Sequence, residues 1–201
     1  MADRIKIARK GRGVEINLSI QYILNCGSGI AGSCHGGSHT GVYELIQQKG
    51  HVPYDTCMPY VACSSESSEG FCSFVDTTCS ATNTCRTCPG FKAKDGACTS
   101  IHQYPNATIA EYGSYGLFTT NKVHKIKAEI YKRGPVAATV KAIPLESYKG
   151  GIVNNGNWLY MIPNHIVSIV GWGNEKGLEY WIVRNSWVRL FLFFHFVLNV
   201  L

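Results

Sequence analysis

The final third of the chain contains the stretch that decides the fold, Asn164-His-Ile-Val-Ser-Ile-Val-Gly-Trp-Gly173, and Glu179-Tyr-Trp-Ile-Val-Arg-Asn-Ser-Trp187 follows it closely. Both segments are rich in Val, Ile and aromatic residues and are separated by a short turn with a glycine, which predicts two neighbouring strands. On adjacent strands His165 and Asn185 can lie side by side and face the same way. A carboxamide oxygen that accepts the ring N–H fixes the orientation and tautomer of an imidazole base. Trp187 can then cover that hydrogen bond and exclude water, which strengthens it.

The remainder of the chain divides into a helical part and a strand-rich part. Apolar spacing predicts helices over residues 2–10, 18–24, 40–49 and 121–133. Strand-like segments separated by Gly-rich turns predict strands over residues 136–143, 165–172 and 178–183. This order indicates an α+β fold of two lobes, a helical, cysteine-rich lobe over residues 1–112 and an antiparallel β lobe over residues 113–187. Residues 188–201 are almost uniformly apolar, without alternation or glycine, and are expected to stand outside this pattern.

Nine cysteines, seven of them between Cys57 and Cys98, are the most unusual feature of the composition. The segment around those seven is polar and has no hydrophobic periodicity, so crosslinks are expected to hold it. Disulfides indicate an oxidising compartment, and the odd number leaves one thiol unpaired. The alternative is a zinc site of four thiolates, formed by Cys79, Cys85, Cys88 and Cys98. A single Cys-x-x-Cys pair among irregular gaps favours disulfides, so no metal and no cofactor are predicted.

The net charge of +6 comes entirely from residues 113–201, and five of the basic residues lie in the predicted helix over residues 121–133. Val, Ile and Ile recur there at helical spacing, so the basic residues are predicted to form its solvated side. No aromatic readers are interleaved with them, which argues against a nucleic-acid partner. No apolar run approaches the roughly 20 residues that span a bilayer, and no signal peptide opens the chain. Two glycosylation sequons begin at Asn17 and Asn106.

Two upstream segments, Cys26-Gly27 and Gly32-Ser-Cys-His-Gly-Gly37, complete a set of motifs with the Asn-His and Asn-Ser-Trp strings. Together they resemble the papain-like cysteine peptidases, over residues 1–187. The strings at residues 1–5, 130–135 and 148–152 make the chain most similar to the cathepsin X (cathepsin Z) branch, whose members remove C-terminal residues.

The resemblance implies a two-lobed, monomeric peptidase without a cofactor, found in a lysosome-like vacuole or outside the cell. It implies that His165 is the base, that Asn185 orients it, and that Trp187 covers the pair. A peptide or protein substrate would lie along Gly36 and Gly37, where side chains would block its approach.

One departure from the family pattern bears on activity. The family's nucleophile string, Cys-Gly-Ser-Cys-Trp-Ala, does not occur in these 201 residues, and the family spacing would place its nucleophile about ten residues before Met1. We therefore expect an incomplete copy, truncated before the nucleophile and altered after Trp187, that does not hydrolyse peptides.

The same comparison bears on the cysteines. Cys34 would bond to the first cysteine of the string that does not occur here, which makes Cys34 the orphan thiol. The resemblance favours the disulfides Cys26–Cys72 and Cys88–Cys98 and leaves the other pairs open.

Two other classes of function remain as alternatives, a non-catalytic peptide-binding homologue of a peptidase and, third, a zinc-binding interaction module. Retention of both His165 and Asn185 argues against the first, since a binding scaffold does not need an aligned base.

Overall fold

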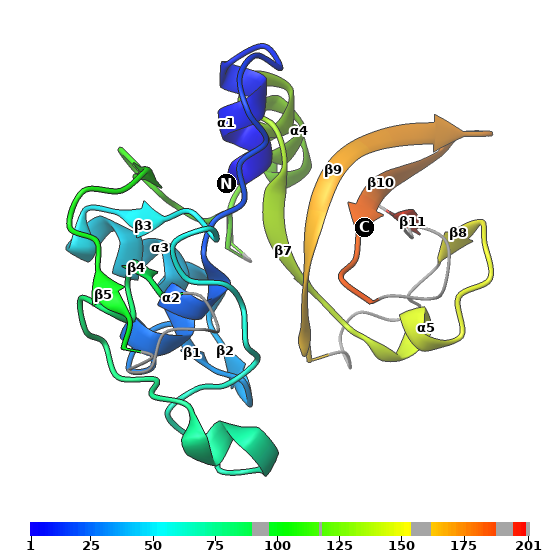
Figure 1. Ribbon diagram of the computed structural model, residues 1–201. Helices are drawn as coiled ribbons and strands as arrows, with labels where there is room; N and C mark the ends of the chain where they lie inside the picture. The colour runs from blue at the N-terminus through cyan, green and yellow to red at the C-terminus, as the bar shows by residue number, and fades with distance from the viewer. Residues whose placement is uncertain (90–96, 117, 154–161, 188–194, 200–201) are drawn as a thin grey trace. The chain divides into compact units, whose positions relative to one another are not determined.

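The computed structural model describes residues 1–89, 97–116, 118–153, 162–187 and 195–199, the last of these as backbone only. The chain forms two compact units (Figure 1). Unit 1 comprises Met1–Ala2 and Gly13–Ser114, and unit 2 comprises Asp3–Arg12 and Tyr115–Leu201. The sequence-based division placed residues 3–12 with the helical lobe, whereas the structure assigns them to unit 2.

The described residues of unit 1 form two α-helices and short strand pairs. Helix α2 (Ile20–Cys26) begins two residues later than predicted, because the Ser19 hydroxyl caps it by accepting a hydrogen bond from the Tyr22 N–H. Helix α3 (His39–Lys49) ends at Gly50, which adopts the left-handed conformation common after helices. The remaining elements are a 3-10 helix, η1 (Gly70–Phe74), and three two-stranded ladders: β1 (Gly32–Ser33) with β2 (Gly36–Gly37), β3 (Val52–Pro53) with β6 (Asn106–Ala107), and β4 (Arg86–Thr87) with β5 (Thr99–Ser100).

Four disulfides hold unit 1 together: Cys26–Cys79, Cys57–Cys85, Cys63–Cys72 and Cys88–Cys98. The last is the pairing that the resemblance implies, but the expected Cys26–Cys72 bond is wrong. The end of α2 packs instead on the segment around Asn83, whose carbonyl accepts a hydrogen bond from the Asn25 side chain. That contact brings Cys26 to Cys79 and leaves Cys72 to Cys63, nine residues away.

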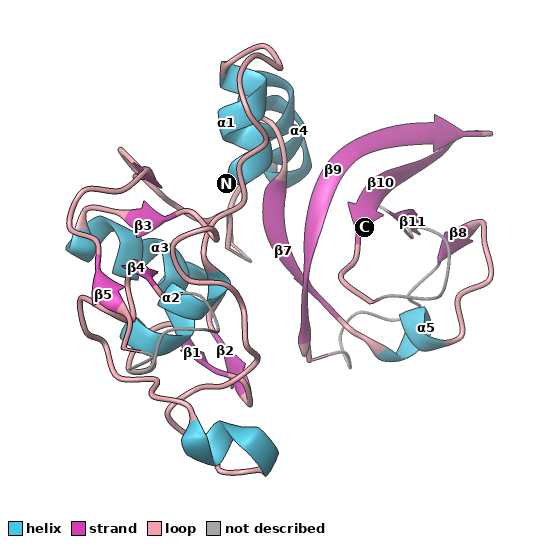
Figure 2. Cartoon of the chain, in the orientation of Figure 1, coloured by secondary structure: helices cyan, strands magenta, loops and turns pink. Residues whose placement is uncertain are grey.

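Unit 2 is a five-stranded sheet with helices packed on it (Figure 2). Its strands, in spatial order, are β7 (Val136–Val140), β9 (His165–Glu175), β10 (Leu178–Arg184), β11 (His195–Asn199) and β8 (Ile152–Val153). The pairs are antiparallel except for β11 with β8, which is parallel and departs from the expected antiparallel lobe. The helices are α1 (Ala2–Ala8), α4 (Lys122–Arg133) and α5 (Ile143–Glu146), so the end of the predicted strand over residues 136–143 is the start of a helix.

The core of unit 2 explains why these elements assemble. Its buried members come from two helices and two strands: Ile130, Leu145, Val167, Ile169, Trp181 and Val183. Helix α1 is fastened beside α4 by Arg4, which donates to the Pro135 carbonyl and pairs with Glu129 at 2.9 Å. Because the partners of Arg4 all lie in unit 2, α1 belongs to that unit.

The apolar end of the chain contributes one described strand to the sheet of unit 2. Residues 195–199 form β11, which pairs with β10 along five residues and with β8 on its other side. Residues 195–199 are thus part of the sheet, whereas residues 188–194 and 200–201 lie outside the described residues.

Candidate active site

His165 opens β9 and pairs with Val140 of β7 across the ladder. Side chains alternate between the two faces of a strand, so His165 shares its face with Val167 and Ile169, both buried in the core of unit 2. The imidazole therefore continues the row of core residues and lies partly buried at the end of that row.

A β-bulge lies between this row and the far end of the sheet. The register pairs Ile182 with Gly171 but pairs the next residue, Val183, with Ile169. Val170 is therefore an extra residue on β9 that has no partner on β10. A bulge of this kind changes which residues of one strand face the same way as those of its neighbour.

The bulge decides which face Asn185 shares. Beyond it Arg184 pairs with Ser168, and the same register carried one residue further sets Asn185 opposite Val167. Without the extra residue Asn185 would be opposite Ser168, on the other face from His165. The bulge thus brings the carboxamide and the imidazole to one side of the sheet.

The contact itself is short. His165 Nε2 lies 2.7 Å from Asn185 Oδ1, and the Ser186 backbone N–H donates to the same oxygen at 2.8 Å. The Ser186 N–H holds Asn185 with its carboxamide oxygen, rather than its nitrogen, toward the ring. Because that oxygen can only accept a hydrogen bond, Nε2 is the protonated nitrogen of the neutral ring. The Nδ1 lone pair of His165 is then available to take a proton from another group.

Trp187 covers the pair on one side. Its ring stacks on His165 with 4.6 Å between the centroids and 29° between the planes. Trp187 is 37% exposed, so it lies between the imidazole and solvent without being part of the core. The ring thus lies beside the imidazole; that it excludes water and so strengthens the His–Asn hydrogen bond stays a prediction.

The glycines predicted to contact substrate lie in unit 1. Gly36 and Gly37 form β2 and are both exposed. A Cβ on Gly37 would lie 2.1 Å from the Ala31 carbonyl oxygen, and Gly36 has a φ of +140°. Their identity is thus required by the turn itself, and their exposed backbone is also accessible to an extended chain.

All nine cysteines lie in unit 1, so unit 2 carries its imidazole without a thiol of its own. Eight form the disulfides, which removes the thiolates that the zinc alternative required, and Cys34 is free and exposed. Among the described residues no cluster of His, Cys, Asp or Glu is arranged to hold a metal ion.

The two sequons differ in their surroundings. Asn106 is exposed in β6 and donates to the Tyr104 carbonyl. Asn17 is exposed as well, but the hydroxyl of its sequon belongs to Ser19, which is buried as the cap of α2. Within the described parts of the chain, no helix combines the length and apolar character needed to cross a bilayer.

Sequence reasoning found His165, Asn185 and Trp187 but did not find the two backbone features that place them, the bulge at Val170 and the Ser186 N–H. Neither has a sequence signal of its own, because Val170 continues an apolar run and every residue there except proline carries an N–H.

Comparisons with known proteins find relatives along nearly the whole chain. A family profile described as papain family cysteine protease matches residues 1–191. Cathepsin Z of Onchocerca volvulus is 37% identical over 190 residues, which cover 93% of this chain and 53% of that protein. Cathepsin B-like cysteine proteinase 3 of Caenorhabditis elegans is 29% identical over 196 residues, 93% of this chain and 48% of that protein.

A solved structure shows the same fold. Digestive procathepsin L 3 of the Tenebrio molitor larval midgut superposes with a TM-score of 0.64 at 21% sequence identity, covering 98% of this chain and 54% of that one. The chain thus spans about half the length of the relatives it matches.

Proposed function

Because the chain belongs to the papain family of cysteine proteases, we propose that His165 and Asn185 are the base and the orienting group of a thiol peptidase. The observation that carries the proposal is the 2.7 Å contact between His165 Nε2 and Asn185 Oδ1. A histidine with a purely structural role needs only hydrogen bonds that satisfy its ring nitrogens. The His165 ring is instead held through Nε2 by a neutral acceptor, and its Nδ1 lone pair is available. That arrangement suits a group that moves a proton.

In the proposed reaction His165 Nδ1 takes the proton of a thiol, and the thiolate attacks the carbonyl carbon of a peptide bond. The imidazolium then delivers that proton to the leaving amine nitrogen as the C–N bond breaks. Water hydrolyses the thioester, with His165 as base again, and restores the thiol. Asn185 keeps the ring in the plane that both transfers need, and Trp187 limits access of water to their hydrogen bond.

We assign the nucleophile to none of the nine cysteines. Eight are in disulfides, and Cys34 lies in the turn between β1 and β2 with its backbone N–H held by Ser64. The family's nucleophile string does not occur within these 201 residues. These residues by themselves are therefore proposed not to hydrolyse peptides.

The substrate class follows from the likeness to cathepsin Z. We propose a peptide substrate whose backbone lies along the exposed glycines Gly36 and Gly37, in the manner of an added strand, and removal of residues from a C-terminus. Four disulfides support an oxidising compartment, a lysosome-like vacuole or the extracellular space. Asn106 is the proposed glycan site and Asn17 the weaker one, and a monomer is proposed.

Labelling with an epoxide or vinyl-sulfone thiol probe, read by mass spectrometry, tests the inactivity of these residues. We expect no label that depends on His165, and reaction of Cys34 with iodoacetamide to the same extent in the parent chain and in His165→Ala. Labelling of any cysteine in the parent chain that disappears in His165→Ala would show that a thiol of these residues is the nucleophile.

A further inference from the structure

The two units carry charge of opposite sign. Unit 2 contains fifteen lysines and arginines and five acidic residues, a net charge of +10, while unit 1 contains four and eight, a net charge of −4; together they give the +6 of the chain. Division of the sequence at residue 112 conceals this contrast, because it assigns the basic residues of α1 to the helical lobe. The contrast appears only once α1 is seen to belong to unit 2.

Most of the excess lies on two neighbouring helices. Helix α1 with the turn after it carries five basic residues, and α4 carries five more: Arg4, Lys6, Arg9, Lys10 and Arg12, and Lys122, Lys125, Lys127, Lys132 and Arg133. The acidic residues on these two elements are Asp3 and Glu129. The two helices lie side by side (Figure 1), and Ile7 of α1 packs where Gly134 follows α4. These ten basic residues therefore lie on adjacent elements, whose solvent-facing side is called the α1–α4 surface.

Part of this charge is used inside unit 2, and part faces solvent. Arg4 pairs with Glu129 at 2.9 Å, and Lys127 pairs with Glu179 at 2.5 Å. Arg9, Lys125 and Lys132, by contrast, are all exposed. Lys125 and Lys132 are seven residues apart, so they lie on the same side of α4, about 10 Å from each other along its axis.

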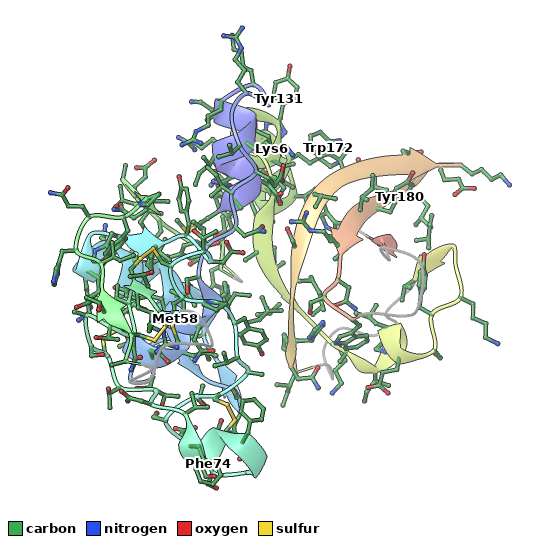
Figure 3. All side chains as sticks on the ribbon, viewed as in Figure 1. Lys6, Met58, Phe74, Tyr131, Trp172 and Tyr180 are labelled. Atoms are coloured by element: carbon green, nitrogen blue, oxygen red, sulfur yellow. A yellow bond between two sulfur atoms is a disulfide. The ribbon has the colours of Figure 1, made fainter. Side chains whose placement is uncertain are left out.

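Two apolar side chains lie among these charges. Tyr131 of α4 is 87% exposed and Ile7 of α1 is 51% exposed. Figure 3 shows Tyr131 and Lys6 on the two helices. Exposed lysines and arginines around an amphipathic aromatic ring and an aliphatic side chain match the boundary between lipid headgroups and acyl chains, where cations meet phosphates and apolar groups enter the interface. A sulfated polysaccharide would use the cations alone.

We propose that the α1–α4 surface binds the surface of a membrane that contains anionic phospholipids. The charges attract the headgroups, and Tyr131 and Ile7 enter the interface without any segment crossing the bilayer. This inference does not depend on the proposed peptidase chemistry, since none of its residues contacts His165, Asn185 or Trp187 in the contacts described above.

Co-sedimentation of the 201-residue chain with vesicles tests the proposal, using phosphatidylcholine with and without phosphatidylserine. We expect binding only with phosphatidylserine, and its loss as salt rises from about 0.1 M to about 1 M, where the Debye length falls from about 10 Å to about 3 Å. The triple variant R9Q/K125Q/K132Q should bind roughly 100-fold more weakly, about fivefold for each charge. The control K49Q/K149Q/K176Q removes the same charge from exposed positions elsewhere and should bind within about threefold of the parent chain.

The aromatic side chain separates lipid from other polyanions. Tyr131→Ser should weaken vesicle binding several-fold at every salt concentration but leave retention on heparin–agarose unchanged, while Tyr60→Ser, at another exposed tyrosine, should change neither. Circular dichroism melting of each variant establishes that it is folded. The proposal is overturned by equal binding to neutral vesicles, by equal weakening in the two triple variants, or by retention on heparin with no vesicle binding.

Discussion

Replacement of Asn185 by alanine removes the carboxamide oxygen that lies 2.7 Å from His165 Nε2. In the parent chain the tautomer protonated on Nδ1 would direct the Nε2 lone pair at that oxygen. The Nδ1–H tautomer would lose a hydrogen bond worth about 1 kcal/mol and would leave the oxygen and the lone pair facing each other. Its free energy would therefore be about 2 kcal/mol above that of the Nε2–H tautomer. A difference of about 2 kcal/mol corresponds to roughly a 30-fold preference for the Nε2–H tautomer.

We expect Asn185→Ala to reduce this tautomer ratio by roughly 30-fold. Long-range proton–nitrogen NMR of the imidazole ring measures it, because protonated and unprotonated ring nitrogens have distinct 15N shifts. The free energy of unfolding should fall by about 1 kcal/mol in the same variant, as for loss of one partly buried hydrogen bond.

Asn164→Ala is the matched control, because the Asn164 side chain accepts from the Ala142 N–H rather than from the ring. It should leave the 15N shifts of His165 unchanged. If Asn185→Ala kept the parent tautomer ratio, Asn185 would not orient the base, and the proposed role of both residues would be refuted.

Three further predictions concern stability and titration. Burial would raise the pKa of Glu129, but hydrogen bonds from two arginines hold it below its ordinary value; its contribution to stability is therefore present at neutral pH and lost as the pH falls below about 4.3. Glu129→Gln should make the free energy of unfolding, measured with denaturant, fall less steeply at acid pH. An unchanged fall would contradict its assignment to Glu129. Burial raises the pKa of Tyr22 to about 12, so its phenolate absorbance near 295 nm should appear only near that pH, with stability present below about pH 10 and lost as the pH rises through 12; titration near 10 in the folded chain would refute the burial. Gly37→Ala, whose Cβ would lie 2.1 Å from the Ala31 carbonyl oxygen, should cost about 2 kcal/mol, whereas Gly113→Ala, with open space around it, should cost less than about 0.5 kcal/mol by thermal melting.

Much of the local structure is determined by the sequence itself. The helices α2, α3 and α4 and the strands β9 and β10 lie within a few residues of their predicted positions, because apolar periodicity records which face of an element is buried. The contact of His165 with Asn185 was predicted for a related reason. The two residues lie on consecutive strands joined by a short turn, so their neighbourhood is set by the chain itself.

Other features depend on groups that meet only through space. Cys26 bonds to Cys79 rather than Cys72 because α2 ends against a particular loop, and no spacing between cysteines encodes that contact. The assignment of α1 to unit 2 depends on Arg4 reaching residues more than a hundred positions away. The bulge at Val170 fixes the face of Asn185, yet it follows from how two strands register against each other. Periodicity specifies which side of an element is apolar, whereas tertiary packing alone decides which element it meets.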